Sequence, residues 1–256
     1  MAARHRFPKT VRTLVTTGGP LDRQDPEFLM RTFLAGAALA AALVSPVLAQ
    51  TATQTATEPA VTITGKIGVV SDYRFRGATF SDEQPALQGG LTATAANGLY
   101  GWVWGSTIDD YGGATTELDV ALGYTFTAGG TTFDVSAARY GYPGGQDVDY
   151  WELPVSASRA FGDWTYGLGF AWSPEQDALG GMDNRYGYVR AAWTSPKVPV
   201  TIAAQLGYED GAFAPDGKWD WSLGVNHKIK AVDVGLAYIG SDRTPDTVVA
   251  SVTAGF

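Results

Sequence analysis

Large apolar residues alternate with small or polar residues from residue 61 to the end of the chain. In residues 118–126 every second position is leucine, valine, tyrosine or phenylalanine, and residues 164–172, 200–208 and 219–225 repeat the pattern. Successive side chains of a β-strand point to opposite faces, so a period of two predicts strands. No helical period follows residue 60. We therefore expect an all-β domain over 61–256.

Twelve such segments follow one another along the chain. We expect strands at 61–76, 85–96, 99–108, 116–126, 131–141, 149–160, 164–172, 184–195, 199–209, 218–228, 231–240 and 247–256. Tight turns are expected at 97–98, 127–130, 162–163, 195–198 and 228–230, and longer connections at 77–84, 109–115, 142–148, 173–183, 210–217 and 241–246. The two kinds of connection alternate. One rim with tight turns and one with longer loops is typical of an up-and-down antiparallel transmembrane β-barrel, here of about twelve strands.

A soluble barrel or sandwich with an apolar interior would show the same alternation. Two features favour a membrane barrel instead. Small and polar residues share one face on strand after strand, as a wet lumen requires. Aromatic residues recur near strand ends on the other face, where interfacial girdles lie. These aromatic residues are Tyr124, Phe126, Trp164, Trp172, Trp193, Tyr208, Trp219, Trp221 and Tyr238.

The N-terminal part predicts export. Residues 30–49 begin with Met-Arg, continue with an apolar run of about a dozen residues and end in Val-Leu-Ala, the pattern of a cleaved signal peptide. The polar, proline-containing stretch 1–29 is unusual ahead of such a signal, and we interpret it as a mis-assigned extension, with a long n-region of the signal peptide as the alternative. Residues 50–60 are rich in threonine and alanine, and we expect a flexible leader. Together with the barrel pattern, export predicts a location in the outer membrane of a bacterial cell.

The last strand ends in Phe256. A final alternating strand with a terminal phenylalanine resembles the signal that the barrel-assembly machinery reads in outer-membrane barrels. We therefore expect that machinery and outer-membrane lipid to be partners of the chain.

Composition excludes several other functions. The net charge of −8 argues against a nucleic-acid partner, and the absence of cysteine excludes a disulfide scaffold. There are two histidines, His5 upstream of the signal and His227 near a tight turn. We therefore expect no catalytic residues, no metal site, no cofactor and no enzymatic activity.

The first strand has a feature of its own, the stretch Val-Ser-Asp-Tyr-Arg-Phe-Arg-Gly at 70–77. An arginine facing the bilayer midplane costs about 2–4 kcal/mol, so Arg74 and Arg76 are expected to point into the lumen. The same alternation would direct Tyr73 and Phe75 towards lipid.

Applying the same alternation to the other strands gives a predicted pore lining. Its members are Lys66, Asp72, Arg74, Arg76, Glu117, Asp119, Asp134, Glu152, Arg190, Gln205, Glu209, Asp220, Asn226 and Asp233. Such a lining can select solutes by charge. It can equally consist of ion pairs that fill and rigidify the interior. Arg139 and Arg159 fall on the lipid face, where we expect them at headgroup level unless the alternation of their strands is assigned with the wrong phase.

The opening of the domain also resembles a known family. The stretch at 70–77, the Ser-Asp loop after it, Pro-Ala-Leu-Gln-Gly-Gly at 85–90 and Tyr-Gly-Trp-Val-Trp at 100–104 resemble the TorF-type porins of Gram-negative bacteria. The resemblance extends more loosely to Phe256. It implies an outer-membrane barrel for passive transport with no catalytic motif.

The sequence leads to one main hypothesis and two alternatives. The main one is an outer-membrane channel for passive diffusion of small hydrophilic solutes. The first alternative is a non-conducting structural or adhesive barrel with a plugged lumen. The second is a soluble periplasmic binding barrel.

Overall fold

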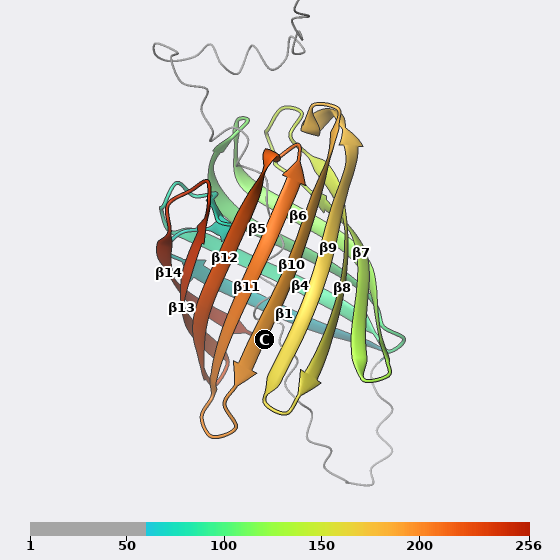
Figure 1. Ribbon diagram of the computed structural model, residues 1–256, viewed down its shortest axis with the longest axis vertical. Coiled ribbons are helices and arrows are strands. Elements are labelled where there is room, and N and C mark those ends of the chain that lie inside the picture. The colour runs from blue at the N-terminus through green and yellow to red at the C-terminus, as the bar shows by residue number, and fades with distance from the viewer. Residues whose placement is uncertain (1–59) are drawn as a thin grey trace, which may run out of the picture.

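The chain folds into one closed ring of twelve antiparallel strands (Figure 1). The computed structural model describes residues 60–256, so the predicted extension, signal peptide and nearly all of the leader lie outside the described residues. The ring runs β1-β14-β13-β12-β11-β10-β9-β8-β7-β6-β5-β4 and returns to β1. The predicted fold class, an up-and-down barrel of about twelve strands, is confirmed. In this part of the chain, no helix is long and apolar enough to cross a bilayer.

The ring strands are β1 (Val61–Val70), β4 (Ala86–Ala95), β5 (Leu99–Tyr111), β6 (Ala114–Ala128), β7 (Thr131–Tyr140), β8 (Tyr150–Phe161), β9 (Trp164–Gln176), β10 (Met182–Thr194), β11 (Val200–Gly211), β12 (Ala214–Ile229), β13 (Val232–Ser241) and β14 (Thr247–Gly255). A short hairpin of β2 (Arg74–Phe75) and β3 (Ala78–Thr79) and one 3-10 turn, η2 (Asp177–Leu179), complete the structure.

Two of the expected long connections are instead the ends of extended hairpins. The ladder between β5 and β6 continues to Tyr111 and Ala114, where Gly112 and Gly113 make the turn with φ angles of 60° and 97°. Left-handed backbone of this kind favours glycine. The β11–β12 hairpin likewise ends in a turn at 212–213 rather than a loop over 210–217. Figure 1 shows these longer hairpins at one rim and the tight turns at the other.

The wall has its apolar side chains outside and its charged ones inside. Leu122, Leu168 and Val189 are each more than half exposed on the outer face. In contrast, Glu117 and Glu209 are fully buried inside the ring. This inverts the distribution of a soluble protein, in which charged residues are almost never fully buried unless paired. An outer face of this kind suits a hydrocarbon surrounding.

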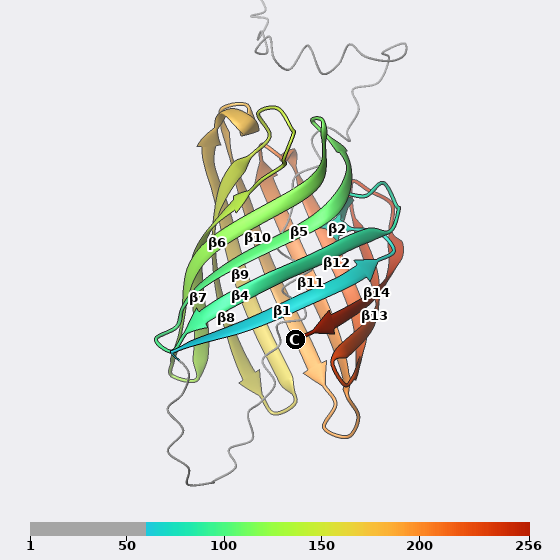
Figure 2. The ribbon, with the colours of Figure 1, turned by 180° about the vertical axis from the view of Figure 1, so that it is seen from behind.

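The first strand departs from the prediction. It ends at Val70 rather than at residue 76, and residues 71–85, which we call the inner segment, turn into the barrel (Figure 2). Tyr73 and Phe75 are therefore not directed towards lipid; only 1% and 3% of their surface is exposed. The expectation for these two residues was wrong, because period-two phasing holds only while the strand continues.

A local hydrogen-bond network explains why the chain leaves the wall at this point. The Asp72 carboxylate accepts hydrogen bonds from Thr79 Oγ1 (2.6 Å) and from Arg74 Nε (2.5 Å). These bonds close the β2–β3 hairpin, whose turn contains Arg76 and Gly77 at φ angles of 45° and 87°. Such side-chain bonds to nearby residues favour a turn over a continuing strand.

The ring closes where β1 pairs with β14, and this seam depends on close backbone approach at Gly68. A Cβ atom at Gly68 would lie 2.6 Å from the carbonyl oxygen of Val252. We expect Gly68→Ala to force β14 away and to destabilise the closed barrel by about 1–3 kcal/mol, as overpacking does. The measurement is the temperature at which the purified barrel loses its compact gel mobility.

Gly101→Ala is the matched control, because a Cβ there meets nothing closer than 3.5 Å. Equal transition temperatures for Gly68→Ala and Gly101→Ala would contradict the close-approach argument.

Candidate functional site

The inner segment places one arginine on the far side of the barrel interior. Arg76 Nη2 lies 2.9 Å from Glu152 Oε2 on β8, and Arg76 Nη1 lies 2.8 Å from Glu209 Oε1 on β11. In the ring, β8 and β11 flank the two strands β9 and β10, which lie opposite β1. The inner segment leaves the wall at β1, so its arginine is anchored across the lumen.

An aromatic ring completes the seat of this guanidinium. The Arg76 side chain stacks over Tyr186 on β10, with 3.8 Å from its central carbon to the ring centroid. Burial alone would lower the pKa of Arg76, but the carboxylates of Glu152 and Glu209 outweigh that effect and raise the pKa above its ordinary value. Arg76 therefore stays charged and forms an ion pair with each of the two carboxylates.

Each of the two carboxylates has further partners on the wall. Glu209 accepts a hydrogen bond from Asn184 Nδ2 at 2.9 Å and forms an ion pair with Lys218 Nζ at 2.8 Å. Glu152 accepts a hydrogen bond from Tyr140 Oη at 3.1 Å. The carboxylates that receive Arg76 are therefore held in position by β7, β10 and β12.

Arg74 has a different role, since it binds within its own end of the barrel. Its guanidinium pairs with Asp72 and with Glu83, and it donates to the carbonyl oxygen of Pro245 at 2.9 Å. The carbonyl of Gly77 accepts a hydrogen bond from the hydroxyl of Thr244, on the same β13–β14 connection. Arg74 therefore holds the inner segment to itself and to the β13–β14 connection, whereas Arg76 holds it to β8 and β11 across the lumen.

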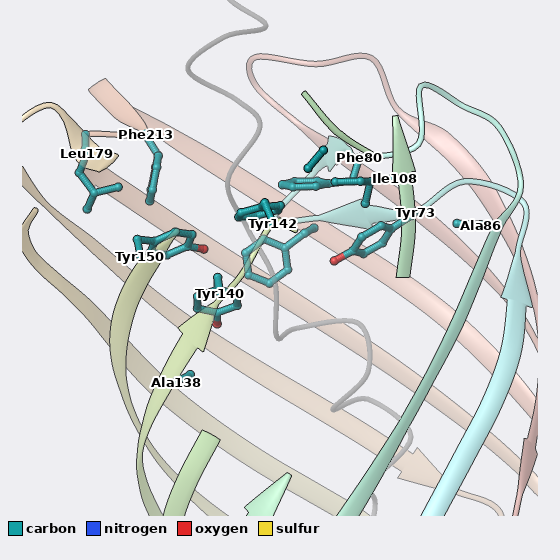
Figure 3. Close-up of a cluster of buried hydrophobic side chains, with 13 residues drawn as sticks. Tyr73, Phe80, Ala86, Ile108, Ala138, Tyr140, Tyr142, Tyr150, Leu179 and Phe213 are labelled. Carbon is teal, nitrogen blue, oxygen red and sulfur yellow. The ribbon is translucent and has the colours of Figure 1, made fainter. Parts of the chain in front are cut away.

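An aromatic cluster packs around the inner segment (Figure 3). The ring centroids of Tyr73 and Phe80 are 5.3 Å apart, and those of Tyr73 and Trp104 are 5.6 Å apart. The Tyr73 hydroxyl donates a hydrogen bond to Glu117 on β6 at 3.2 Å. Burial, with the charges of Glu117 and Asp119, raises the pKa of Tyr73 well above its ordinary value, so the phenol remains a proton donor at neutral pH.

The predicted lining residues divide into two groups by burial. The first group is fully buried around the inner segment and comprises Asp72, Arg74, Arg76, Glu117, Asp119, Glu152, Glu209 and Asp220. The second group is half-buried and comprises Lys66, Asp134, Arg190, Gln205, Asn226 and Asp233. Of the second group, Asp134 accepts a hydrogen bond from Tyr100 and Gln205 donates one to Tyr186. The structure thus gathers the first group around the inner segment, with one set of ion pairs at Arg74 and another at Arg76, and leaves the second group spread along the wall.

Three residues that contact Arg76 or Glu209 are not among the predicted lining residues: Asn184, Tyr186 and Lys218. The period of two could have found all three. Tyr186 and Asn184 precede Arg190 by even steps, and Lys218 lies two residues before Asp220. An inward phase for Arg190 and Asp220 therefore implies the same phase for these neighbours.

The two arginines assigned to the lipid face lie near opposite rims. Arg139, on β7, pairs with Asp149 at the rim of the longer hairpins. Arg159, on β8, is exposed near the tight turn at 162–163. Within residues 60–256, no group of three or more His, Cys, Asp and Glu side chains is arranged to hold a metal ion. The charged groups gathered around the inner segment are suited to holding that segment inside the barrel by electrostatic attraction.

A family model described as "Bacterial protein of unknown function (Gcw_chp)" matches residues 53–254. The chain belongs to the Gcw_chp family. The match includes the whole inner segment and all but the last residue of the twelve ring strands of this family member. No curated protein matches it in sequence.

Solved structures similar to this Gcw_chp protein are barrels. A structure described as KdgM porin has a TM-score of 0.54 at 11% identity, covering 76% of this chain and 98% of that one. The KdgM porin in complex with disordered oligogalacturonate has a TM-score of 0.55 at 10% identity, with the same coverage. An outer membrane channel from Pseudomonas putida F1 has a TM-score of 0.49 at 10% identity, covering 77% and 96%. At these identities the likeness to the two KdgM structures concerns the fold alone, which is that of a porin barrel.

The anchoring of the inner segment can be tested by limited proteolysis. Arg76→Met removes the cation from two buried carboxylates, and breaking buried ion pairs costs about 3–5 kcal/mol. We expect the segment to leave its seat and trypsin to cut after Arg74, which is buried in the native barrel. Mass spectrometry of the fragments measures the cleavage rate.

Arg139→Met is the control, since it also removes an arginine ion pair but lies on the wall away from the inner segment. If Arg76→Met leaves residue 74 as protected as Arg139→Met does, the pairs with Glu152 and Glu209 do not hold the segment.

Proposed function

We propose that this member of the Gcw_chp family is an outer-membrane channel through which small hydrophilic solutes diffuse passively. The observation that carries the proposal is the inside-out wall: apolar side chains cover the outer face of the closed ring, and charged side chains line its inner face. A closed barrel satisfies its backbone hydrogen bonds without a free edge, as hydrocarbon requires. The fold shared with porin barrels supports the same conclusion.

The two groups of inward residues suggest how the path is shaped. The half-buried group, including Lys66 and Arg190, gives the tight-turn half of the lumen a polar, water-accessible wall. The fully buried group surrounds the inner segment at the other end. We therefore expect a vestibule open on the tight-turn side and a constriction formed by the inner segment. Solutes pass beside the Arg76 network or when the segment moves.

Other parts of the proposal come from the sequence. Export by the signal peptide at 30–49, insertion by the barrel-assembly machinery through Phe256, and the outer-membrane location all fit the inside-out wall. The TorF-type resemblance supports passive transport. The solute is defined here only by its class, small and hydrophilic.

A non-conducting barrel is a second candidate, and the Arg76 network itself favours it. Two buried ion pairs, a stacked tyrosine and an aromatic cluster together fill the lumen at one end. In that case the barrel would serve as a structural element of the outer membrane.

Conductance in planar bilayers tests the channel. We expect the purified protein to give small discrete steps and Arg76→Met to give larger ones. The loss of about 3–5 kcal/mol from the seated segment shifts its occupancy about a hundredfold or more. Removal of a lumen cation should also move the reversal potential in a salt gradient.

Arg139→Met again serves as the control and should conduct like the native protein. If neither the native protein nor Arg76→Met conducts after verified insertion, the channel proposal fails and the structural barrel takes its place. If the protein stays monomeric in buffer without detergent, both fail.

A further inference from the structure

The outer wall carries an apolar hollow between β6 and β9. Ala157 on β8 lies directly between two large cross-strand partners, Phe133 on β7 and Leu168 on β9. A hollow of about 250 Å³ lies over Ala157 and its neighbours on the outer wall. The hydrophobic side chains that line it are Phe126, Phe133, Val135, Val155, Ala157, Leu168 and Phe170.

An arginine stands at the tight-turn end of this hollow. Arg159 lies two residues beyond Ala157 on the same strand, which places it on the same outward face at a separation of roughly 7 Å. It is exposed, and its guanidinium lies 5.1 Å from the ring centroid of Phe161. A cation beside an apolar hollow can bind an amphiphile, because the cation attracts the charged headgroup and the hollow accommodates the hydrocarbon chain.

Arg159 differs from the other arginines of the outer wall in lacking a carboxylate. Arg139 pairs with Asp149, and Arg185 pairs with Asp183. Among residues 60–256, no carboxylate lies within ion-pairing distance of Arg159. Its charge complements an anion supplied from outside the chain.

The aromatic residues around Arg159 indicate its depth in a membrane. Tyr166 pairs directly with Arg159 across the β8–β9 ladder, and its ring stacks on that of Trp164 at 6.0 Å. All three side chains, with Phe161, are exposed on the outer wall beside a tight turn. Tyrosine and tryptophan gather at the level of lipid headgroups. Arg159 therefore lies at phosphate depth, and the hollow lies at acyl-chain depth.

We propose that Arg159 and the hollow over Ala157 form a binding site for one anionic phospholipid. The guanidinium holds the phosphate through its paired N–H donors, and one acyl chain occupies the hollow. The site rests on the membrane placement of the proposed function. It adds a specific lipid ligand on the outer wall, away from the lumen and the inner segment.

Native mass spectrometry tests the site. The protein is released from detergent micelles containing phosphatidylglycerol and phosphatidylethanolamine in equal amounts, and the retained lipid is identified by its mass. We expect one phosphatidylglycerol per barrel. Arg159→Gln should lower its retention several-fold by removing the charge, and Ala157→Leu should do so by filling the hollow.

Two controls match these variants. Lys197→Gln removes a cation from the β10–β11 turn at the same rim, and Ala204→Leu enlarges an exposed alanine on β11. Both should retain lipid like the native protein. Equal loss in test and control variants would show nonspecific attraction to the rim and overturn the site.

Two further outcomes would overturn it. Retention that is unchanged in both Arg159→Gln and Ala157→Leu places the lipid elsewhere. If native mass spectrometry shows a dimer of the native protein that Ala157→Leu dissociates, the hollow binds a second copy of the chain instead of a lipid. Flotation of each variant with liposomes measures insertion separately, so failure of the site and failure of the membrane placement are distinguishable.

Discussion

Every strand of the ring has a hydrogen-bonded neighbour on both sides, and this closure organises the whole domain. A sheet placed in hydrocarbon, as we propose for this one, must leave no backbone donor or acceptor unpaired. That requirement is met by ring closure, in which β1 pairs with β14 on one side and with β4 on the other. Once the ring is closed, alternation assigns every side chain to lipid or to lumen. The apolar outer wall and the inward charges follow from that closure, while the position of the inner segment depends on its own bonds to Asp72, Glu152 and Glu209.

The inner segment shows how a barrel of this size deals with its interior. Twelve strands enclose more space than their own side chains fill, yet less than a wide porin. Residues 71–85 occupy one end with aromatic packing and place Arg76 against the opposite wall. A buried arginine is tolerated only with its charge matched, which Glu152 and Glu209 provide. The same ion pairs fix the position of the inner segment inside the barrel.

Local pattern predicted much of this structure. The strand count, the antiparallel order and the inward phase of Glu117, Glu152 and Glu209 follow from a period of two, because a strand has only two faces. Tyr73 and Phe75 were misplaced because nothing in the alternation of 61–76 marks the end of β1 at Val70. The partners of Arg76 lie 76 and 133 residues away in sequence, and no local rule connects residues so distant.

That separation also bears on the order in which the barrel is built. Glu152 and Glu209 belong to strands that come long after the inner segment in the chain. Until β8 and β11 are in place, Arg76 has no seat and its charge needs water. The interior must therefore stay hydrated until β11 has joined the ring, and the inner segment is anchored across the lumen only after that point.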